Sequence, residues 1–286
     1  MKGTVYKSTG SWYTVKGTDG HFYECRIKGK FRMKGIKSTN PIAVGDLVSF
    51  DLEAAEITET SSGLAQGVIH TITDRKNYIV RKSVNLSKQT HIIAANLDRV
   101  FLMVTLNNPP TLTPFIDRFL VSAEAYGIEA VLLFNKIDSY DTEELFEVKY
   151  LKHLYESIGY NCIEISAITG QNVPELKALM KDQVTLFSGH SGVGKSTLVN
   201  AIENKLDLKT AQISAQHMQG QHTTTFAEMY DLSFGGHIID TPGIKGFGIV
   251  DLEPADIGNY FPEFFALKQQ CKFHNCLHLE EPKCAV

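Results

Sequence analysis

The chain has 286 residues, of which 43% are hydrophobic and 21% are charged, and its formal net charge is −4. This length exceeds a typical single domain, so we expect two or three domains with sizeable buried cores. No stretch approaches the roughly 20 apolar residues of a membrane span, and no apolar targeting segment opens the chain, which argues against a membrane protein and predicts a cytoplasmic one.

The first seventy residues are rich in short β-like runs separated by turn signals. Five such runs at this spacing predict a small closed barrel, and the OB-fold is the commonest nucleic-acid-binding barrel of this kind. We therefore expect an OB-fold RNA-binding domain over residues 1–72. The expected strands cover residues 3–6, 12–16, 22–27, 46–52 and 67–72.

Charge is distributed unevenly over this predicted barrel. Six basic residues and no acidic one lie between Arg26 and Lys37, so we expect this loop to attract RNA phosphates. Five acids and no base follow between Asp46 and Glu59, which predicts two electrically opposite sides. The alternative for both runs is an ordinary solvated surface. Nearby aromatic residues could stack on bases or fill the barrel core: Trp12, Tyr13, Phe22, Tyr23 and Phe31.

Residues 99–250 alternate strand-like and helical stretches, the pattern of a parallel sheet covered by helices on both faces. With a basic connector at residues 73–98, this predicts an α/β domain over residues 73–250. The expected strands cover residues 99–106, 129–134, 161–165, 184–187 and 237–239, with a further strand near 89–96. The first helix has Pro114 in its first turn and a predicted apolar face of Leu112, Phe115, Ile116, Phe119, Leu120 and Ala123.

A phosphate-binding loop follows the predicted strand at residues 184–187. The sequence fits G-x-x-x-x-G-K-[ST], in which backbone N–H groups and a helix N-terminus converge on one anion. Lys195 is predicted to reach the β- and γ-phosphates, and the Ser196 hydroxyl to hold Mg²⁺. The alternative is a glycine-rich turn that binds nothing. The loop and the residue after it are Gly189, His190, Ser191, Gly192, Val193, Gly194, Lys195, Ser196 and Thr197.

Two short motifs at the ends of other strands predict which base is bound. The first is Asn135-Lys136-Ile137-Asp138. The Asp138 carboxylate can accept the N1–H and 2-amino groups of guanine, and adenine offers no matching pair, so the site should prefer GTP to ATP. The alternative is a helix cap at this tetrapeptide. The second motif is Ser166-Ala167, where a small residue lets a backbone N–H approach the base carbonyl.

Two motifs beyond the phosphate-binding loop fit residues that respond to a γ-phosphate. Thr224 or Thr225 is predicted to complete the Mg²⁺ coordination, with an ordinary polar loop as the alternative. Asp240 is predicted to hold Mg²⁺ through water, and the Gly243 N–H group to sense the γ-phosphate. Movement here would pass through a short connection to residues 251–286.

The C-terminal residues 251–286 hold three of the five cysteines. Three thiolates and one imidazole form a full tetrahedral set for one structural Zn²⁺, with no open position for catalysis. The predicted ligands are Cys271, Cys276, His278 and Cys284. His274 could replace His278, and free thiols in a reducing cytosol are the alternative to a metal. So short a segment needs its metal to fold, so we expect a small zinc-binding domain.

The motifs resemble those of Ras-like GTPases, but in rotated order. N-K-x-D and S-A precede the phosphate-binding loop, the threonine run and D-T-P-G, whereas the phosphate-binding loop comes first in Ras-like enzymes. With a barrel in front and cysteines behind, the whole chain resembles the RsgA family of circularly permuted GTPases of small-ribosomal-subunit biogenesis. The resemblance favours His278 over His274 as the zinc ligand.

This resemblance implies a GTP hydrolase, dependent on Mg²⁺ and carrying one structural Zn²⁺, that acts in late maturation of the small (30S) ribosomal subunit. The subunit would stimulate hydrolysis, and the GTP or GDP state would control binding to the subunit and its rRNA. We expect a monomer with no membrane partner. Rival interpretations are a nucleotide-gated RNA-binding module with incidental turnover and an ATP-dependent P-loop kinase, which the Asn135–Asp138 motif opposes.

The water-orienting residue departs from the Ras-like pattern. Ile244 stands where Ras-like enzymes carry a glutamine, so we expect slow hydrolysis without a partner. His222 is the predicted catalytic residue, His190 is a second candidate, and the alternative is that neither acts. Gln221 stands beside His222 where the family commonly has an arginine, so any contact of that arginine is not expected here.

Overall fold

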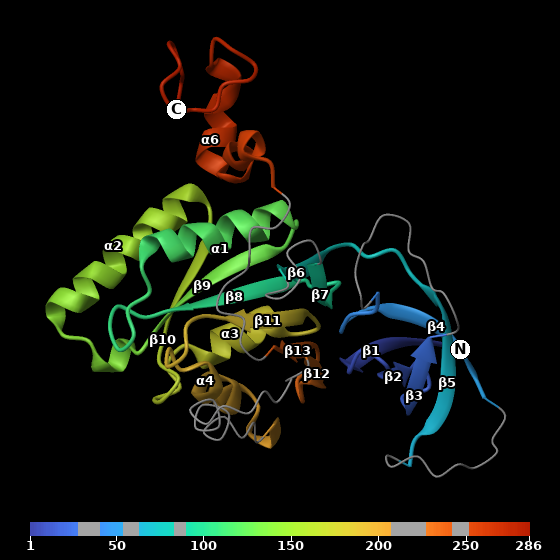
Figure 1. Cartoon of the computed structure of the whole chain (residues 1–286). Coiled ribbons are helices and arrows are strands. Elements are labelled where there is room, and N and C mark those ends of the chain that lie inside the picture. The colour runs from blue at the N-terminus through green and yellow to red at the C-terminus, as the bar shows by residue number, and fades with distance from the viewer. Residues whose placement is uncertain (28–40, 54–62, 83–89, 207–226, 242–251) are drawn as a thin grey trace, which may run out of the picture.

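The computed structural model of the chain describes residues 1–27, 41–53, 63–82, 90–206, 227–241 and 252–286 (Figure 1). A β-barrel, an α/β sheet domain and a small C-terminal segment follow one another along the chain. Figure 1 shows the barrel on one side of the sheet domain and the C-terminal segment beyond helix α1. None of the helices in these ranges combines the length and apolar character needed to cross a bilayer.

The first five strands close a small barrel. Strand β1 pairs with both β2 and β4, and β3 runs parallel to β5, so the order β1-β2-β3-β5-β4 returns to β1. Alternate side chains fill the interior, where Val5, Val15 and Phe50 are fully buried. The predicted OB-like barrel is confirmed. Its strands are β1 (Lys2–Ser8), β2 (Tyr13–Gly17), β3 (Phe22–Ile27), β4 (Leu47–Leu52) and β5 (Ala65–Ile72).

The aromatic residues of the barrel divide between its core and its surface. Tyr13 and Tyr23 are buried in the barrel core, which is the core-filling alternative. Phe22 is exposed, and its ring contacts that of Tyr6, with 5.3 Å between ring centroids. Phe31 lies outside the described residues, as does the predicted basic loop after residue 27.

Asp46 does not belong to the acidic surface expected from its sequence neighbourhood, because its side chain is fully buried. Its carboxylate accepts hydrogen bonds of 2.6 Å from Nε and 2.6 Å from Nη2 of Arg75. The Ala43 N–H donates to the same carboxylate at 2.8 Å. Arg75 comes from the connector, so the buried pair fastens the barrel to the segment that leads into the sheet domain.

The described part of the sheet domain has the strand order β10-β9-β8-β11-β13-β12. The first five of these run parallel, and β12 is antiparallel to β13. Both faces of a parallel sheet are covered, which explains the uninterrupted apolar runs seen in the sequence. The strands are β8 (Arg99–Val104), β9 (Glu129–Asn135), β10 (Asn161–Ile165), β11 (Val184–Ser188), β12 (Glu228–Asp231) and β13 (His237–Asp240). The connector adds a hairpin of β6 (Tyr78–Lys82) and β7 (Thr90–Ala95).

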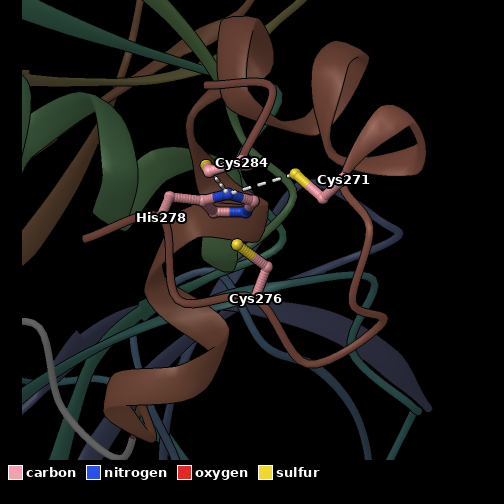
Figure 2. Close-up of side chains that lie close together, drawn as sticks. All are labelled: Cys271, Cys276, His278 and Cys284. Carbon is pink, nitrogen blue, oxygen red and sulfur yellow. Dashed lines mark hydrogen bonds between the residues drawn. The ribbon is translucent and has the colours of Figure 1, made fainter. Parts of the chain in front are cut away.

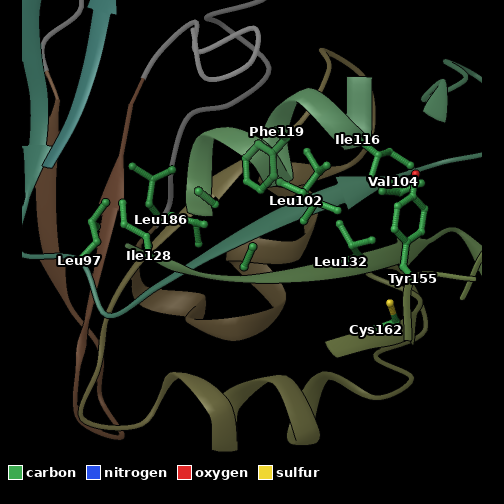
Figure 3. Close-up of a cluster of buried hydrophobic side chains, with 14 of the residues drawn as sticks. Leu97, Leu102, Val104, Ile116, Phe119, Ile128, Leu132, Tyr155, Cys162 and Leu186 are labelled. Atoms are coloured by element: carbon green, nitrogen blue, oxygen red, sulfur yellow. The ribbon is translucent and has the colours of Figure 1, made fainter. Parts of the chain in front are cut away.

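Helices cover the two faces of this sheet. Helices α1 (Thr113–Ala125) and α2 (Thr142–Ile158) pack on one face, and α3 (Val173–Met180) and α4 (Lys195–Ile202) pack on the other. Figure 3 shows the first of these cores, in which Phe119 of α1 lies over Leu102 of β8. Leu112 does not join the predicted apolar face: it is the N-cap of α1 and 66% exposed.

Short helical turns complete the fold. They are η1 (Ile137–Ser139) and η2 (Asn204–Leu206) in the sheet domain, and η3 (Pro254–Tyr260), α6 (Pro262–Leu267) and η4 (Lys268–Gln270) in the C-terminal segment.

The barrel joins the sheet domain through strands β1 and β12, with Lys7 opposite Glu228. Beside this pairing lies a junction cluster of Tyr6, Lys16, Asp231 and His237. The Asp231 carboxylate accepts hydrogen bonds of 2.6 Å from the Tyr6 hydroxyl and 2.5 Å from Lys16 Nζ. His237 Nδ1 lies 3.0 Å from Asp231 Oδ1. The barrel is thus attached to the β12–β13 hairpin, which leads directly into Asp240.

Candidate guanine-nucleotide site and metal cluster

The phosphate-binding loop connects β11 to α4 and can be built only with glycine at its two ends. Gly189 and Gly194 have φ values of +142° and +98°. A Cβ atom on Gly194 would lie 2.6 Å from Asn135 Nδ2, and one on Gly189 would lie 2.9 Å from the Met103 carbonyl oxygen. The two ends of the loop therefore pack closely against Met103 of β8 and Asn135 of β9. The loop leads into α4, whose first N–H groups have no partners within the helix. This cradle fits a phosphate group.

Lys195 and Asp240 place opposite charges beside this loop. Lys195 Nζ donates hydrogen bonds of 2.5 Å to the Gly189 carbonyl and 2.8 Å to the His190 carbonyl. Burial lowers the pKa of the Lys195 ammonium, and the charge of Asp240 opposes that shift. Burial raises the pKa of the Asp240 carboxyl, opposed by the Thr241 N–H and by Lys195. A half-buried ammonium and a half-buried carboxyl at neighbouring strand ends fit a phosphate and its Mg²⁺.

Asn135 ties the predicted base-binding motifs to the phosphate-binding loop. Its side chain is 1% exposed. The Nδ2 group donates a hydrogen bond of 2.8 Å to the Val193 carbonyl, and Oδ1 accepts one of 3.0 Å from the Ala167 N–H. One buried amide thus holds together loops that follow three different strands, β9, β10 and β11.

Asp138 lies at the mouth of this arrangement, where it is exposed. The Ser166 hydroxyl donates to Asp138 Oδ1 at 2.5 Å and accepts a hydrogen bond of 3.1 Å from the Thr169 N–H. Ser166 therefore orients the carboxylate that was predicted to read guanine. Lys136 has a left-handed backbone with φ of 70°, and its Nζ donates to the Asn108 carbonyl at 2.5 Å.

The structure also brings in residues that the sequence analysis missed. The Tyr140 hydroxyl donates to the Asn135 carbonyl and accepts from the Leu106 N–H, each at 2.9 Å. The Phe115 ring packs against the His190 ring at an interplanar angle of 34°, with 4.1 Å between ring centroids. The stretch from Leu106 to Phe115, which follows β8 and enters α1, thus contacts both loops. The sequence places this segment directly after a predicted parallel strand, and ligands bind at the carboxyl ends of such strands, so its position could have indicated a role in the site.

The remaining predicted site residues are only partly described. Ser196 and Thr197 lie in the first turn of α4, with Ser191 and Gly192 exposed just before it. Burial, followed by the charge of Lys195, lowers the pKa of His190. Five predicted positions lie outside the described residues: His222, Thr224, Thr225, Gly243 and Ile244.

The predicted zinc ligands lie together in the C-terminal segment (Figure 2). The ligand atoms of Cys271, Cys276, His278 and Cys284 all lie within 4.8 Å of one another. His278 Nδ1 is 3.7 Å from Cys271 Sγ and 3.4 Å from Cys284 Sγ. Zinc–sulfur bonds of about 2.3 Å in a tetrahedron would separate the sulfur atoms by roughly 3.8 Å, so the cluster could hold a metal ion.

Comparison with known proteins agrees with this geometry. The model of the RsgA GTPase family matches residues 72–250, and that of the RsgA N-terminal domain matches residues 2–58. The chain belongs to the RsgA GTPase family. It is therefore a GTP-hydrolysing enzyme, and Mg²⁺ is the general cofactor of such enzymes. The predicted family and activity are confirmed.

Relatives of the RsgA family match over the whole chain. The small ribosomal subunit biogenesis GTPase RsgA of Christiangramia forsetii is 70% identical over 286 residues, which is 100% of this chain and 89% of the relative. The protein of the same name from Bacteroides fragilis is 57% identical, with the same coverage.

Solved structures of similar proteins have the same fold. The crystal structure of YjeQ from Thermotoga maritima matches with a TM-score of 0.75 and 35% identity, over 99% of this chain and 88% of that one. YloQ, described as a circularly permuted GTPase, matches with a TM-score of 0.72 and 28% identity, over 99% of this chain and 85% of that one. The expected circularly permuted GTPase fold is confirmed.

Proposed function

We propose that this GTPase acts in late maturation of the small ribosomal subunit. The subunit would stimulate hydrolysis, and the GTP or GDP state would control binding to the subunit and its rRNA. The names of the relatives support the small ribosomal subunit as the partner. The observation that best supports guanine-nucleotide binding is the buried Asn135 amide, which joins the predicted base-binding motifs to the phosphate-binding loop.

Each predicted residue has a role in this proposal. The loop from Gly189 to Thr197 surrounds the phosphates, and Lys195 leaves its own loop carbonyls to bind the β- and γ-phosphates. Asp138, held by Ser166, accepts the two donors of guanine. The Ala167 N–H donates to Asn135 Oδ1, and the small Ala167 side chain lets the base carbonyl approach the backbone here. Ser196 and Asp240, with Thr224 or Thr225, would hold Mg²⁺, which neutralises phosphate charge when it is bound.

The group that orients the attacking water is proposed from sequence. His222 is the first candidate, because an apolar Ile244 stands in the usual glutamine position. His190 is less suited, because its ring packs against the Phe115 ring. In this proposal the Gly243 N–H senses the γ-phosphate and passes its presence toward the C-terminal segment.

The three parts of the chain have different roles in this proposal. Residues 1–72 would bind rRNA, residues 73–250 would bind and hydrolyse GTP, and residues 251–286 would fold around Zn²⁺ held by Cys271, Cys276, His278 and Cys284. The four-ligand geometry supports zinc over a metal that prefers oxygen ligands. We propose a monomer that works in the cytoplasm.

The test is hydrolysis of GTP by the purified protein, alone and with isolated small ribosomal subunits, with ATP as the control nucleotide. We expect a slow basal rate that the subunit raises strongly, and no comparable turnover of ATP. Subunit binding that depends on GTP without stimulated turnover would instead indicate a nucleotide-gated binding module. No effect of the subunit on rate or binding would contradict the proposal.

A further inference from the structure

Helix α2 exposes an apolar stripe that nothing in the described chain covers. Phe146, Tyr150 and Leu154 are spaced four residues apart, so they lie along one side of the helix. Their exposures are 74%, 62% and 38%. The opposite side of α2 is the one that packs on the sheet, through Val148, Leu151 and Tyr155. Two exposed aromatic rings in line are unusual for a surface that faces only water.

The stripe leads into a cavity between the sheet domain and the C-terminal segment. The cavity has a volume of about 300 Å³ and is bounded by α1, α2 and the residues at the start of α6. Leu154 belongs both to the stripe and to the cavity wall. Phe261 and Tyr160 give the wall further apolar surface. A single segment of another protein could therefore lie along α2 and place one side chain in the cavity.

The charges of this surface are acidic. Asp117 and Glu263 line the cavity, and its described lining residues include no lysine or arginine. The Asp117 carboxylate accepts a hydrogen bond from a tyrosine hydroxyl, at 2.8 Å. On α2 itself, the exposed charged residues are the glutamates 143, 147 and 156 and a single lysine, Lys149. A cationic side chain entering the cavity would meet two carboxylates and aromatic rings, the groups that bind lysine and arginine.

We propose that the α2 stripe and the adjoining cavity form a docking surface for a basic protein segment of the small ribosomal subunit. The inference rests on the proposed function for the identity of the particle. Within a particle made of rRNA and protein, the sign of charge decides between the two: rRNA is a polyanion that acidic side chains repel, whereas a lysine- or arginine-bearing segment is attracted. The exposed apolar rings supply the anchors of a protein interface.

Photocrosslinking tests the surface directly. The full-length protein with p-benzoylphenylalanine in place of Tyr150 is bound to purified small subunits with a GTP analogue and irradiated. A matched control carries the crosslinker in place of Lys181, which is exposed at the end of α3 on the other face of the sheet. We expect position 150 to crosslink to a subunit protein within a segment that contains lysine or arginine, and position 181 not to reach that segment.

The other outcomes overturn the proposal in distinguishable ways. Crosslinks to rRNA, crosslinks to a second copy of the chain, or no crosslink while the protein cosediments with subunits would each overturn the docking surface alone. Failure of the wild-type protein to cosediment at all would overturn the proposed function and the docking surface together.

Charge reversal gives a second test that needs no crosslinker. Glu147→Lys should weaken subunit binding by about three- to tenfold, because it places a cation where a basic segment docks. A surface that faces rRNA would instead bind more tightly after this change. Glu175→Lys, on α3, is the matched control and should leave affinity within about twofold. Unchanged or tighter binding of Glu147→Lys would overturn the proposal, with GDP affinity serving as the check on folding.

Discussion

Replacing Asn135 by alanine should weaken both the fold and nucleotide binding. The change removes a donor to the Val193 carbonyl at 2.8 Å and an acceptor for the Ala167 N–H at 3.0 Å. Each buried backbone group left without a partner costs about 1–3 kcal/mol, so we expect the free energy of urea unfolding to fall by roughly 2–6 kcal/mol. The loops proposed to hold the base and the phosphates also lose their shared anchor. GDP affinity should therefore fall by at least about tenfold, or ~1.4 kcal/mol, in a titration with a fluorescent GDP analogue.

Asn77→Ala is the matched control for this experiment. Asn77 is also buried, and its amide makes the same kind of bridge: Nδ2 donates to the Leu97 carbonyl and Oδ1 accepts from the Leu97 N–H, each at 2.8 Å. This variant should lose a similar amount of stability while GDP affinity stays within about twofold. Equal losses of GDP affinity in the two variants, or normal affinity after Asn135→Ala, would refute the proposed role of Asn135.

Three further predictions address the parts around the site. Arg75→Met leaves the fully buried Asp46 carboxylate without its cation, so the free energy of urea unfolding should fall by about 3–5 kcal/mol; a loss below about 1 kcal/mol would contradict the assigned pairing. Removing the metal with a chelator, or the change Cys276→Ser, should expose residues 252–286 to trypsin while GDP binding persists, because folding and metal binding are coupled there; equal protease resistance with and without metal would count against this. Burial alone raises the pKa of Asp231, but the hydrogen bonds of the junction cluster lower it below its ordinary value of 3.8. The stabilisation by this carboxylate is then complete above pH 3.8 and lost as the pH falls through the lowered pKa, so the destabilisation caused by Asp231→Asn should shrink below that pH; a difference independent of pH would contradict the assignment.

The parallel strands and the nucleotide motifs were predictable because their signals are local. Strand β10 was expected at the residues it occupies, since a short apolar run ends at the polar Ser166. Glycines at 189 and 194 are required by the backbone of the loop itself. The spacing of three cysteines and one histidine likewise indicates a metal ligand set wherever the chain brings it together.

What the sequence could not predict depends on contacts between distant residues. Strand β12 has only four residues and one buried side chain, Met229, so it has no periodicity to detect. Asp46 was expected to be a surface acid because its partner, Arg75, lies 29 residues away in the sequence, and the sequence does not show that the two meet. Leu112 read as part of a helical face because a helix boundary is set by capping geometry as well as by apolar spacing.

The most direct test of the central claim, that these loops form one guanine-reading site, is the base preference of Asp138→Asn. Xanthine carries a carbonyl oxygen where guanine has its 2-amino group, and an asparagine amide offers one donor and one acceptor in place of two acceptors. Competition binding should show that the wild-type protein prefers GDP over XDP and that the variant prefers XDP over GDP. If the ratio of the two affinities is the same in both proteins, Asp138 does not read the base and the account of the site is wrong.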